Sequence, residues 1–137
     1  MDRLEIEQFA EQPLLAILTT VNADGSPQST PVWYLYDGER FKVTSRGDRV
    51  KVRNIRRDPR VAIVVVDTAA NGDPLTVRGT AEVVEEGGEA FTYTMARRYE
   101  GRRRGDKEAR GLIGLARGMG QPRVIINITP ERVRLGD

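Results

Sequence analysis

The chain has 137 residues, of which 39% are hydrophobic and 31% are charged, and its formal net charge is +2 at pH 7. This length is enough for one hydrophobic core, so we expect a single domain over residues 1–137. Neither cysteine nor histidine occurs in the sequence, which excludes disulfides, thiolate or histidine metal sites and a Ser-His-Asp triad. No run approaches the roughly eighteen apolar residues of a membrane span, and no signal-peptide pattern is present, so we expect a cytoplasmic protein without a membrane span or a bound metal.

The predicted elements begin with a short amphipathic helix over residues 4–11 and a nearly continuous apolar strand over residues 14–21, consistent with a strand buried on both faces or with a barrel wall. A turn at residues 22–25 leads into an alternating strand over residues 28–36. Pro31 in that strand cannot donate a ladder hydrogen bond, which indicates an edge strand or a bulge. A second tight turn at Asp37-Gly38 precedes a strand over residues 41–45.

The second half of the chain alternates strands with helical segments. A helix is predicted from an Asp48 N-cap to about Arg57, followed by strands over residues 60–67 and 75–84, a helix over residues 87–99 and a final strand over residues 124–129. The tight turns between the early strands disfavour parallel winding. We therefore predict a mainly β fold, a β-barrel of six or so mostly antiparallel strands with peripheral helices.

Residues 40–60 hold nine basic residues against only Asp48 and Asp58. Such a concentration of charge beside a strand end, a glycine and a helix start predicts an anion site, with phosphate as the favoured anion. The alternative is that these residues form a solvated basic face of a helix, as runs of charged residues usually do.

The local chemistry of this segment supports the anion site. Thr44 and Ser45 place two hydroxyls at the end of a strand, and Arg49 and Lys51 lie in the first turn of the predicted helix. Cations at a helix N-terminus oppose the helix dipole by about 0.3–1 kcal/mol. A bound phosphate would reverse this penalty, because it accepts hydrogen bonds from the side chains and from the free backbone amides. Asp48 alone could also offset it.

Four stretches of the chain resemble the pyridoxamine 5′-phosphate oxidase-like split β-barrel superfamily. They are LLAILTTVNADGSPQSTPVWYLYDGERF, TSRGDRVKVRNIRRDPRVAIVVVD, VRGTAEVV and ITPERV, and their order and spacing carry the resemblance over residues 14–135. More narrowly, the chain is similar to the branch of deazaflavin (F420)-dependent reductases. The resemblance implies an FMN-binding-like split barrel and a homodimer with two cofactor sites at the subunit interface.

The resemblance also implies which residues bind the cofactor. Those expected at its phosphate are Arg46, Arg49, Lys51 and Asn54; those expected along its ring are Gln28, Ser29 and Thr30; and those expected at the ring edge or ribityl chain are Thr44 and Ser45. Trp33 has an ordinary explanation as a filler of the core or of a dimer interface.

The activity that the resemblance implies is hydride transfer between F420 and a small organic substrate with an electron-poor C=C or C=N bond. A groove formed by Arg53, Arg56 and Arg57, or by Arg102 to Arg104, would suit the glutamate tail of F420, and this basic excess favours F420 over FMN. The open alternatives are an FMN-dependent oxidase or reductase of the same fold and a non-enzymatic F420- or flavin-binding protein.

A nucleic-acid binder is the third alternative. It is disfavoured because no aromatic residues are interleaved with the basic run, so we expect no nucleic-acid partner. The sequence identifies no catalytic acid, although Tyr34 and Tyr36 are candidate proton donors. The glycine-rich segment over residues 101–121 is predicted to form either a lid over the cofactor or a disordered loop.

Overall fold

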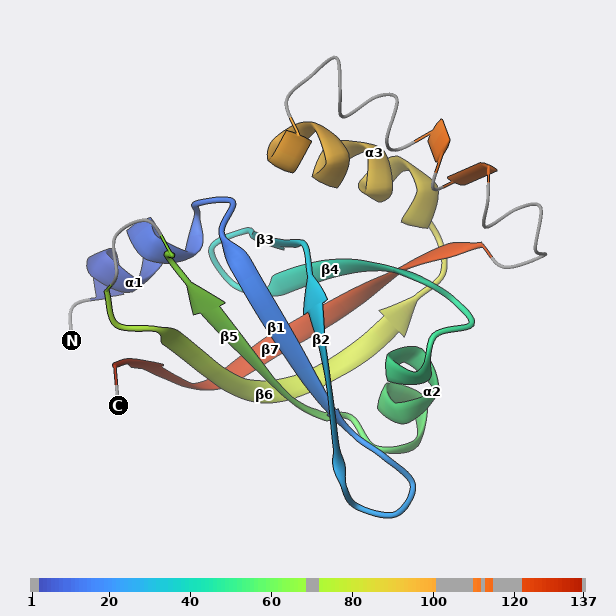
Figure 1. Cartoon of the computed structure of the whole chain (residues 1–137), viewed down its shortest axis with the longest axis horizontal. Helices are drawn as coiled ribbons and strands as arrows, with labels where there is room; N and C mark the ends of the chain where they lie inside the picture. The colour runs from blue at the N-terminus through green and yellow to red at the C-terminus, as the bar shows by residue number, and fades with distance from the viewer. Residues whose placement is uncertain (1–2, 69–71, 101–109, 112, 115–121, 137) are drawn as a thin grey trace.

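The computed structural model describes residues 3–68, 72–100, 110–111, 113–114 and 122–136. Over these residues, seven strands form one curled antiparallel sheet in the order β2-β1-β5-β6-β7-β4-β3, and three helices lie around it (Figure 1). The protein is therefore a split β-barrel with peripheral helices, and the predicted fold class is confirmed. Within the described part of the chain, no helix combines the length and apolar character needed to cross a membrane.

The elements follow the predicted order. They are α1 (Arg3–Ala10), β1 (Leu15–Val21), β2 (Pro27–Val32), β3 (Tyr34–Tyr36), β4 (Phe41–Arg46), α2 (Val50–Arg57), β5 (Arg60–Val66), β6 (Leu75–Val84), α3 (Gly88–Glu100) and β7 (Arg123–Leu135). The predicted lid or disordered loop over residues 101–121, with Arg102 to Arg104, lies outside the described residues except for four positions.

The strand predicted over residues 28–36 is in fact two strands that meet at Trp33. β2 pairs with β1 at one edge of the sheet, whereas β3 pairs with β4 at the other edge. Only one residue separates β2 from β3, and two peptide units span at most about 7 Å. The sheet must therefore curl until its two edges meet at Trp33, which closes the barrel. Pro31 lies in the edge strand β2, as its missing amide predicts.

The core fills the inside of this curled sheet. β1 is buried on one face only, with Ala16 and Leu18 inside and Leu15 49% exposed, so of the two predicted roles the barrel wall is confirmed and burial on both faces is wrong. The inward side chains that pack together come from all parts of the sheet, namely Ala16, Leu18, Tyr34, Phe41, Val43, Ile63, Val65, Val77, Ile126 and Ile128.

Helix α2, which lies in the basic segment, packs against β1 and β6, and α3 packs against β4 and β7. α2 packs Val52 and Ile55 into the core. Its N-cap is Arg49, not the predicted Asp48, and this end has no side-chain cap. Asp48 instead accepts a hydrogen bond from Arg46 Nε at 2.9 Å, because a bidentate partner two residues away competes with the capping role.

Helix α3 approaches the first residues of β7 very closely. A Cβ placed on Gly88, the first residue of α3, would lie 2.0 Å from the carbonyl oxygen of Arg123. Only glycine permits this contact. The contact fixes the start of α3 against the start of β7.

Candidate functional site

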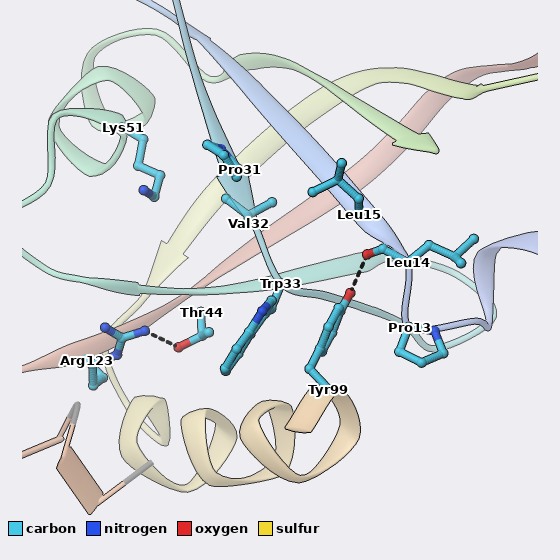
Figure 2. A pocket seen from close by; sticks show the side chains of 10 residues that line it. All are labelled: Pro13, Leu14, Leu15, Pro31, Val32, Trp33, Thr44, Lys51, Tyr99 and Arg123. Carbon is cyan, nitrogen blue, oxygen red and sulfur yellow. Dashed lines mark hydrogen bonds between the residues drawn. The ribbon is translucent and has the colours of Figure 1, made fainter. Parts of the chain in front are cut away.

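A cavity of about 440 Å³ lies where β2, α2, α3 and the start of β7 come together (Figure 2). Its lining residues are Pro13, Leu14, Leu15, Pro31, Val32, Trp33, Thr44, Lys51, Tyr99 and Arg123. One side is therefore apolar and aromatic, and the other carries two cations and a hydroxyl. In Figure 2 the two cations point into the space from α2 and from β7.

Lys51 is one of these cations and comes from the first turn of α2. Its side chain is half-buried, and its Nζ lies 3.5 Å from Thr30 Oγ1 on β2. Burial lowers the pKa of Lys51, and the neighbouring positive charges of Arg49 and Arg123 lower it further. The described residues provide no carboxylate partner for Lys51.

Arg123 is the second cation and is the first residue of β7. It is only 8% exposed. Its Nε donates to Thr92 Oγ1 at 3.2 Å and its Nη2 donates to Thr44 Oγ1 at 2.9 Å. Burial lowers the pKa of Arg123 to about 10, and Arg46 and Arg49 contribute in the same direction. In the described part of the chain Arg123 has no carboxylate partner, so a buried charge is left uncompensated, which is costly in a protein interior.

Thr44 and Thr92 orient the Arg123 guanidinium. Thr44 is buried on β4, and its Oγ1 lies 2.7 Å from Thr92 Oγ1 on α3. Thr92 Oγ1 can also donate to the Gly88 carbonyl oxygen, at 2.9 Å. This buried chain of hydroxyls holds Arg123 in place while leaving guanidinium donors available to a ligand.

The other predicted phosphate residues lie around these two cations. Arg49 is exposed at the N-cap of α2. Arg46 is paired with Asp48, and this pair raises the pKa of Arg46 and lowers that of Asp48. Neither Arg46 nor Arg49 lines the cavity.

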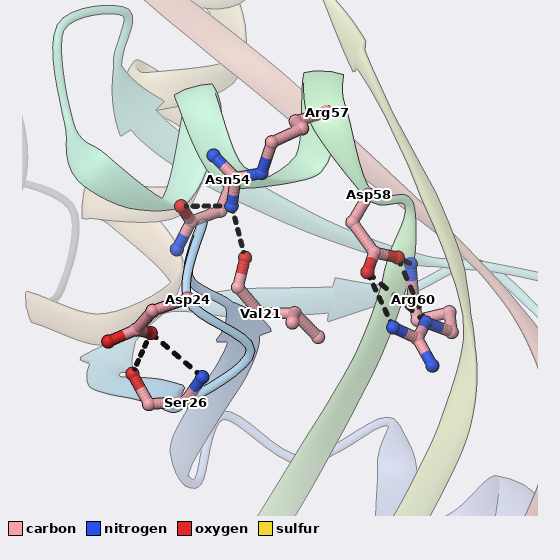
Figure 3. Close-up of polar contacts among 7 residues, drawn as sticks. All are labelled: Val21, Asp24, Ser26, Asn54, Arg57, Asp58 and Arg60. Carbon is pink, nitrogen blue, oxygen red and sulfur yellow. Dashed lines mark hydrogen bonds and ion pairs between the residues drawn. The ribbon is translucent and has the colours of Figure 1, made fainter.

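Asn54 is buried and does not line the cavity, and its amide is used within the chain (Figure 3). Its Nδ2 donates to Thr20 Oγ1 at 3.0 Å and to Asn22 Oδ1 at 2.9 Å. Its Oδ1 accepts from Arg57 Nη2 at 2.9 Å, and Arg57 also reaches the Val21 carbonyl oxygen. Asn54 therefore ties α2 to the end of β1.

The predicted ring-contacting residues lie on the edge strand β2 and at the end of β4. Thr30 is the nearest of them to Lys51. Ser29 Oγ lies 2.8 Å from Thr19 Oγ1, and Gln28 is half-buried next to it. Ser45 is buried and donates to the Arg46 carbonyl oxygen at 3.0 Å. The structure thus brings Thr44 and Lys51 together with Arg123 at the cavity, with Thr30 beside them.

Two aromatic residues form the wall of the cavity next to α3. The rings of Trp33 and Tyr99 are stacked, with centroids 5.2 Å apart and planes 9° from parallel. Sequence reasoning did not select Tyr99 or Arg123. Both lie far from the basic segment in the chain, and nothing in the sequence distinguishes Arg123 from the other arginines.

The tyrosines that the sequence offers as proton donors are poorly suited to that role. Tyr34 is fully buried, its hydroxyl donates to the Gln12 carbonyl oxygen, and burial raises its pKa. The Tyr36 hydroxyl donates to the Gly38 carbonyl oxygen at 3.0 Å. Each hydroxyl proton is thus directed at a backbone carbonyl, so water is the better source of a proton.

The cavity residues fit a ligand that has an anionic group and an apolar ring. Lys51 and Arg123 can donate to phosphate oxygens, and an anion would compensate their charge. The apolar and aromatic side suits a ring system. Among the described residues, no group of three or more acidic side chains is placed to hold a metal ion.

Comparisons with known proteins agree with this fold. The sequence profile described as pyridoxamine 5′-phosphate oxidase matches residues 3–136. Over 80 residues, the chain is 40% identical to a 5a,11a-dehydrotetracycline/5a,11a-dehydrooxytetracycline reductase of Streptomyces rimosus; the match covers 52% of this chain and 56% of that protein, so the chain spans only about half the length of this relative.

Two solved structures extend the comparison over nearly the whole chain. An F420 reductase is similar with a TM-score of 0.74 at 31% identity, covering 93% of this chain and 94% of that one. A conserved hypothetical protein of Mycobacterium tuberculosis has a TM-score of 0.73 at 28% identity, covering 100% of this chain and 85% of that one. The chain belongs to the pyridoxamine 5′-phosphate oxidase family.

Proposed function

We propose that the protein is an F420-dependent oxidoreductase that acts on a small organic substrate with an electron-poor C=C or C=N bond. The observation that carries this proposal is the pair of cations, the half-buried Lys51 and the buried Arg123, on one side of a cavity whose other side is apolar and aromatic. The similarity to an F420 reductase over most of both chains favours F420 among the cofactors of the family.

In this proposal the cofactor phosphate binds between α2 and the start of β7. The residues that contact the cofactor are those that the resemblance implies, with Arg123 added: Gln28, Ser29, Thr30, Thr44, Ser45, Arg46, Arg49, Lys51 and Arg123. Asn54 acts by fixing α2 to β1, since its amide is used within the chain.

When bound, F420 supplies the hydride. The protein binds and orients the cofactor and excludes water from the site. Lys51 and Arg123 neutralise the phosphate. The hydrogen-bonded hydroxyls of Thr44 and Thr92 fix the Arg123 guanidinium, so that this side chain needs little ordering when the cofactor binds. The proton that completes the reduction comes from water, because the Tyr34 and Tyr36 hydroxyls donate to backbone carbonyls.

A homodimer is part of the same proposal. Leu15 lines the cavity and is 49% exposed, and a second copy of the chain would cover such apolar surface and complete a site for a ligand as long as F420. FMN is the alternative cofactor, because the anion site alone does not distinguish the two phosphates.

The test is a parallel titration of the purified protein with F420 and FMN, followed by cofactor emission and by the emission of Trp33, the only tryptophan. We expect F420 to bind at least about tenfold more tightly than FMN, a difference of 1.4 kcal/mol. A preference for FMN would move the protein to the flavin enzymes of the same fold. Binding of neither cofactor would contradict the proposal.

Turnover separates an enzyme from a carrier. Reduced F420 bound to the protein should be oxidised when an electron-poor alkene is added, at a rate that saturates with the alkene. A protein that binds F420 tightly but never accelerates this oxidation over a broad panel would be a carrier.

A further inference from the structure

Trp33 stacks on Tyr99 at the cavity and is not part of the core cluster. Trp33 is half-buried at the crossing between β2 and β3, and both rings line the cavity. In Figure 2 the two rings lie nearly parallel, with Thr44 and Arg123 on one side of the pair and Pro13 and Leu14 on the other. The indole therefore belongs to the wall of the site.

Tyr99 is held in position by three separate backbone groups. Its hydroxyl donates to the Leu14 carbonyl oxygen at 3.0 Å and accepts from the Tyr34 amide at 3.2 Å, and the Tyr34 carbonyl oxygen lies 3.3 Å away. A tyrosine ring has only two side-chain torsions, so these contacts fix its plane. Trp33 stacks on a surface that is set before any ligand binds.

Arg98, the preceding residue, anchors the same end of α3. Its Nη2 donates to the Glu11 carbonyl oxygen at 2.8 Å and its Nε donates to the Tyr34 carbonyl oxygen at 3.2 Å. Its guanidinium also lies 5.8 Å from the centre of the Tyr99 ring. Residues 98–99 thus join α3 to two segments that border the cavity.

We propose that the Trp33–Tyr99 stack is the specificity-determining wall of the substrate site, and that it selects flat, unsaturated ring compounds. Tyr99 is the positioning residue, since it fixes the plane of Trp33, and Trp33 contacts the substrate. That the ligand at this wall is a substrate rests on the proposed function, whereas the preference for flat rings is a property of the Trp33–Tyr99 stack itself. A fixed aromatic surface favours a flat ring by about 0.5–1.5 kcal/mol beyond buried area, which corresponds to about 2- to 13-fold in affinity.

The test compares two neutral probes that share a carbon skeleton, 1,4-naphthoquinone and its saturated counterpart decahydronaphthalene-1,4-dione. Calorimetric titrations use protein loaded with oxidised F420, so that no reduction occurs, and are repeated without F420. The chain has no cysteine to react with the quinone. We expect the flat probe to bind about 5-fold more tightly, Trp33→Leu to abolish this preference, and Tyr99→Leu to reduce it.

Tyr99→Phe is the matched control, because it keeps the stacked ring and should keep most of the preference. The positioning role has a second readout: Tyr99→Leu should lower the emission anisotropy of Trp33, whereas Tyr99→Phe should not. Equal preference for the flat probe in wild type and Trp33→Leu, or no preference in the wild type, would overturn the inference. Failure of the wild type to bind F420 would instead contradict the proposed function, and the titrations without F420 would still decide the role of the wall.

Discussion

Two surface arginines, Arg56 and Arg60, differ from the cations of the cavity in their exposure and in the presence of a counterion. Arg60 is exposed, and its pairing with Asp58 lowers the pKa of that carboxyl to about 2 (Figure 3). Arg56 pairs with Glu85 at 2.9 Å in a similarly open setting. Exposed pairs of this kind contribute little to stability, so these arginines serve mainly to balance charge on the surface.

The cavity cations show the reverse pattern. Lys51 and Arg123 are more buried than Arg56 or Arg60, yet the described residues supply no carboxylate to either of them, and the pKa of each is lowered. Keeping two uncompensated cations in one cavity costs stability unless a ligand compensates them. A buried cation without a counterion is therefore a better indication of the candidate site than the density of arginine.

The largest effect is expected when both cavity cations are removed, and a second variant that lacks two surface cations of existing ion pairs serves for comparison. Lys51→Met with Arg123→Met should weaken F420 binding by at least about 100-fold, since each charge-assisted hydrogen bond contributes about 1.5–3 kcal/mol. The control is Lys42→Met with Arg60→Met, which removes the same residue types from the pairs with Asp37 and Asp58. Titration with F420 should show a change of less than about 3-fold for the control.

The two double variants also differ in stability. Without ligand, the cavity variant should be at least as stable as the wild type in urea, because it removes uncompensated buried charge. Equal loss of F420 affinity in both double variants would show that only net charge matters and would contradict the account.

The next largest effect is expected at Gly88, where α3 meets β7. Gly88→Ala places a Cβ 2.0 Å from the Arg123 carbonyl oxygen, and the resulting shift should cost about 1–3 kcal/mol or more in unfolding free energy. Because the same shift displaces Arg123, F420 affinity should fall as well. Gly72→Ala, where a Cβ meets nothing within 4 Å, is the control and should leave unfolding in urea and F420 binding unchanged.

A smaller effect is expected from the hydroxyl that orients Arg123. Thr92→Val leaves the Arg123 Nε without its acceptor, so stability should fall by about 1–3 kcal/mol, and F420 affinity should fall about 3- to 10-fold, the equivalent of up to 1.4 kcal/mol. Thr94→Val, two residues along α3, removes a hydroxyl that donates to the Ala90 carbonyl oxygen at 3.3 Å and does not contact Arg123. Equal F420 affinity in the two variants would contradict the claim that the Thr92 hydroxyl orients Arg123.

The smallest effect is expected at Arg46, which has a carboxylate partner, as Arg56 and Arg60 do, but lies close enough to Arg123 to lower its pKa. Asp48→Asn removes the carboxylate that pairs with Arg46 beside the cavity. If Arg46 belongs to the phosphate site, releasing it should raise F420 affinity by about 2-fold, the size expected of a solvent-accessible ion pair. A titration that shows unchanged or weaker binding would leave Arg46 among the surface arginines.

Most of the fold could be predicted because strands and turns leave local patterns. The alternation in β6 and the apolar run of β5 gave their positions within one residue. The break at Trp33 was not visible, since the alternation continues through it while the strand changes partner. β7 was predicted to end before Pro130, but it continues to Leu135, because the irregularity between Arg78 and Gly79 on β6 accommodates the missing amide of Pro130.

The site could be predicted only where it is local in sequence. Lys51 and Thr44 belong to the basic segment and its strand, and both line the cavity. Arg123 and Tyr99 reach the cavity through the pairing of β4 with β7 and through the packing of α3. No periodicity or local charge pattern encodes such contacts between distant segments.

The most direct test of the account is the pKa of Lys51 with and without F420, measured by NMR of the lysine side chains. The chain has three lysines, so Lys51→Arg assigns the signal. Burial lowers the free pKa of Lys51 below the ordinary value of 10.5, and the charged form alone attracts the phosphate. Binding should therefore raise this pKa, and F420 affinity should fall as pH rises through the free value.

The stability of the ligand-free protein should rise with pH, whereas F420 affinity falls. A lysine with a lowered folded pKa destabilises the fold at low pH, and this penalty is relieved as pH rises from the folded value towards 10.5. We predict that F420 raises the pKa of Lys51. An unchanged Lys51 pKa in the F420-bound protein would contradict the claim that Lys51 and Arg123 bind the cofactor's phosphate.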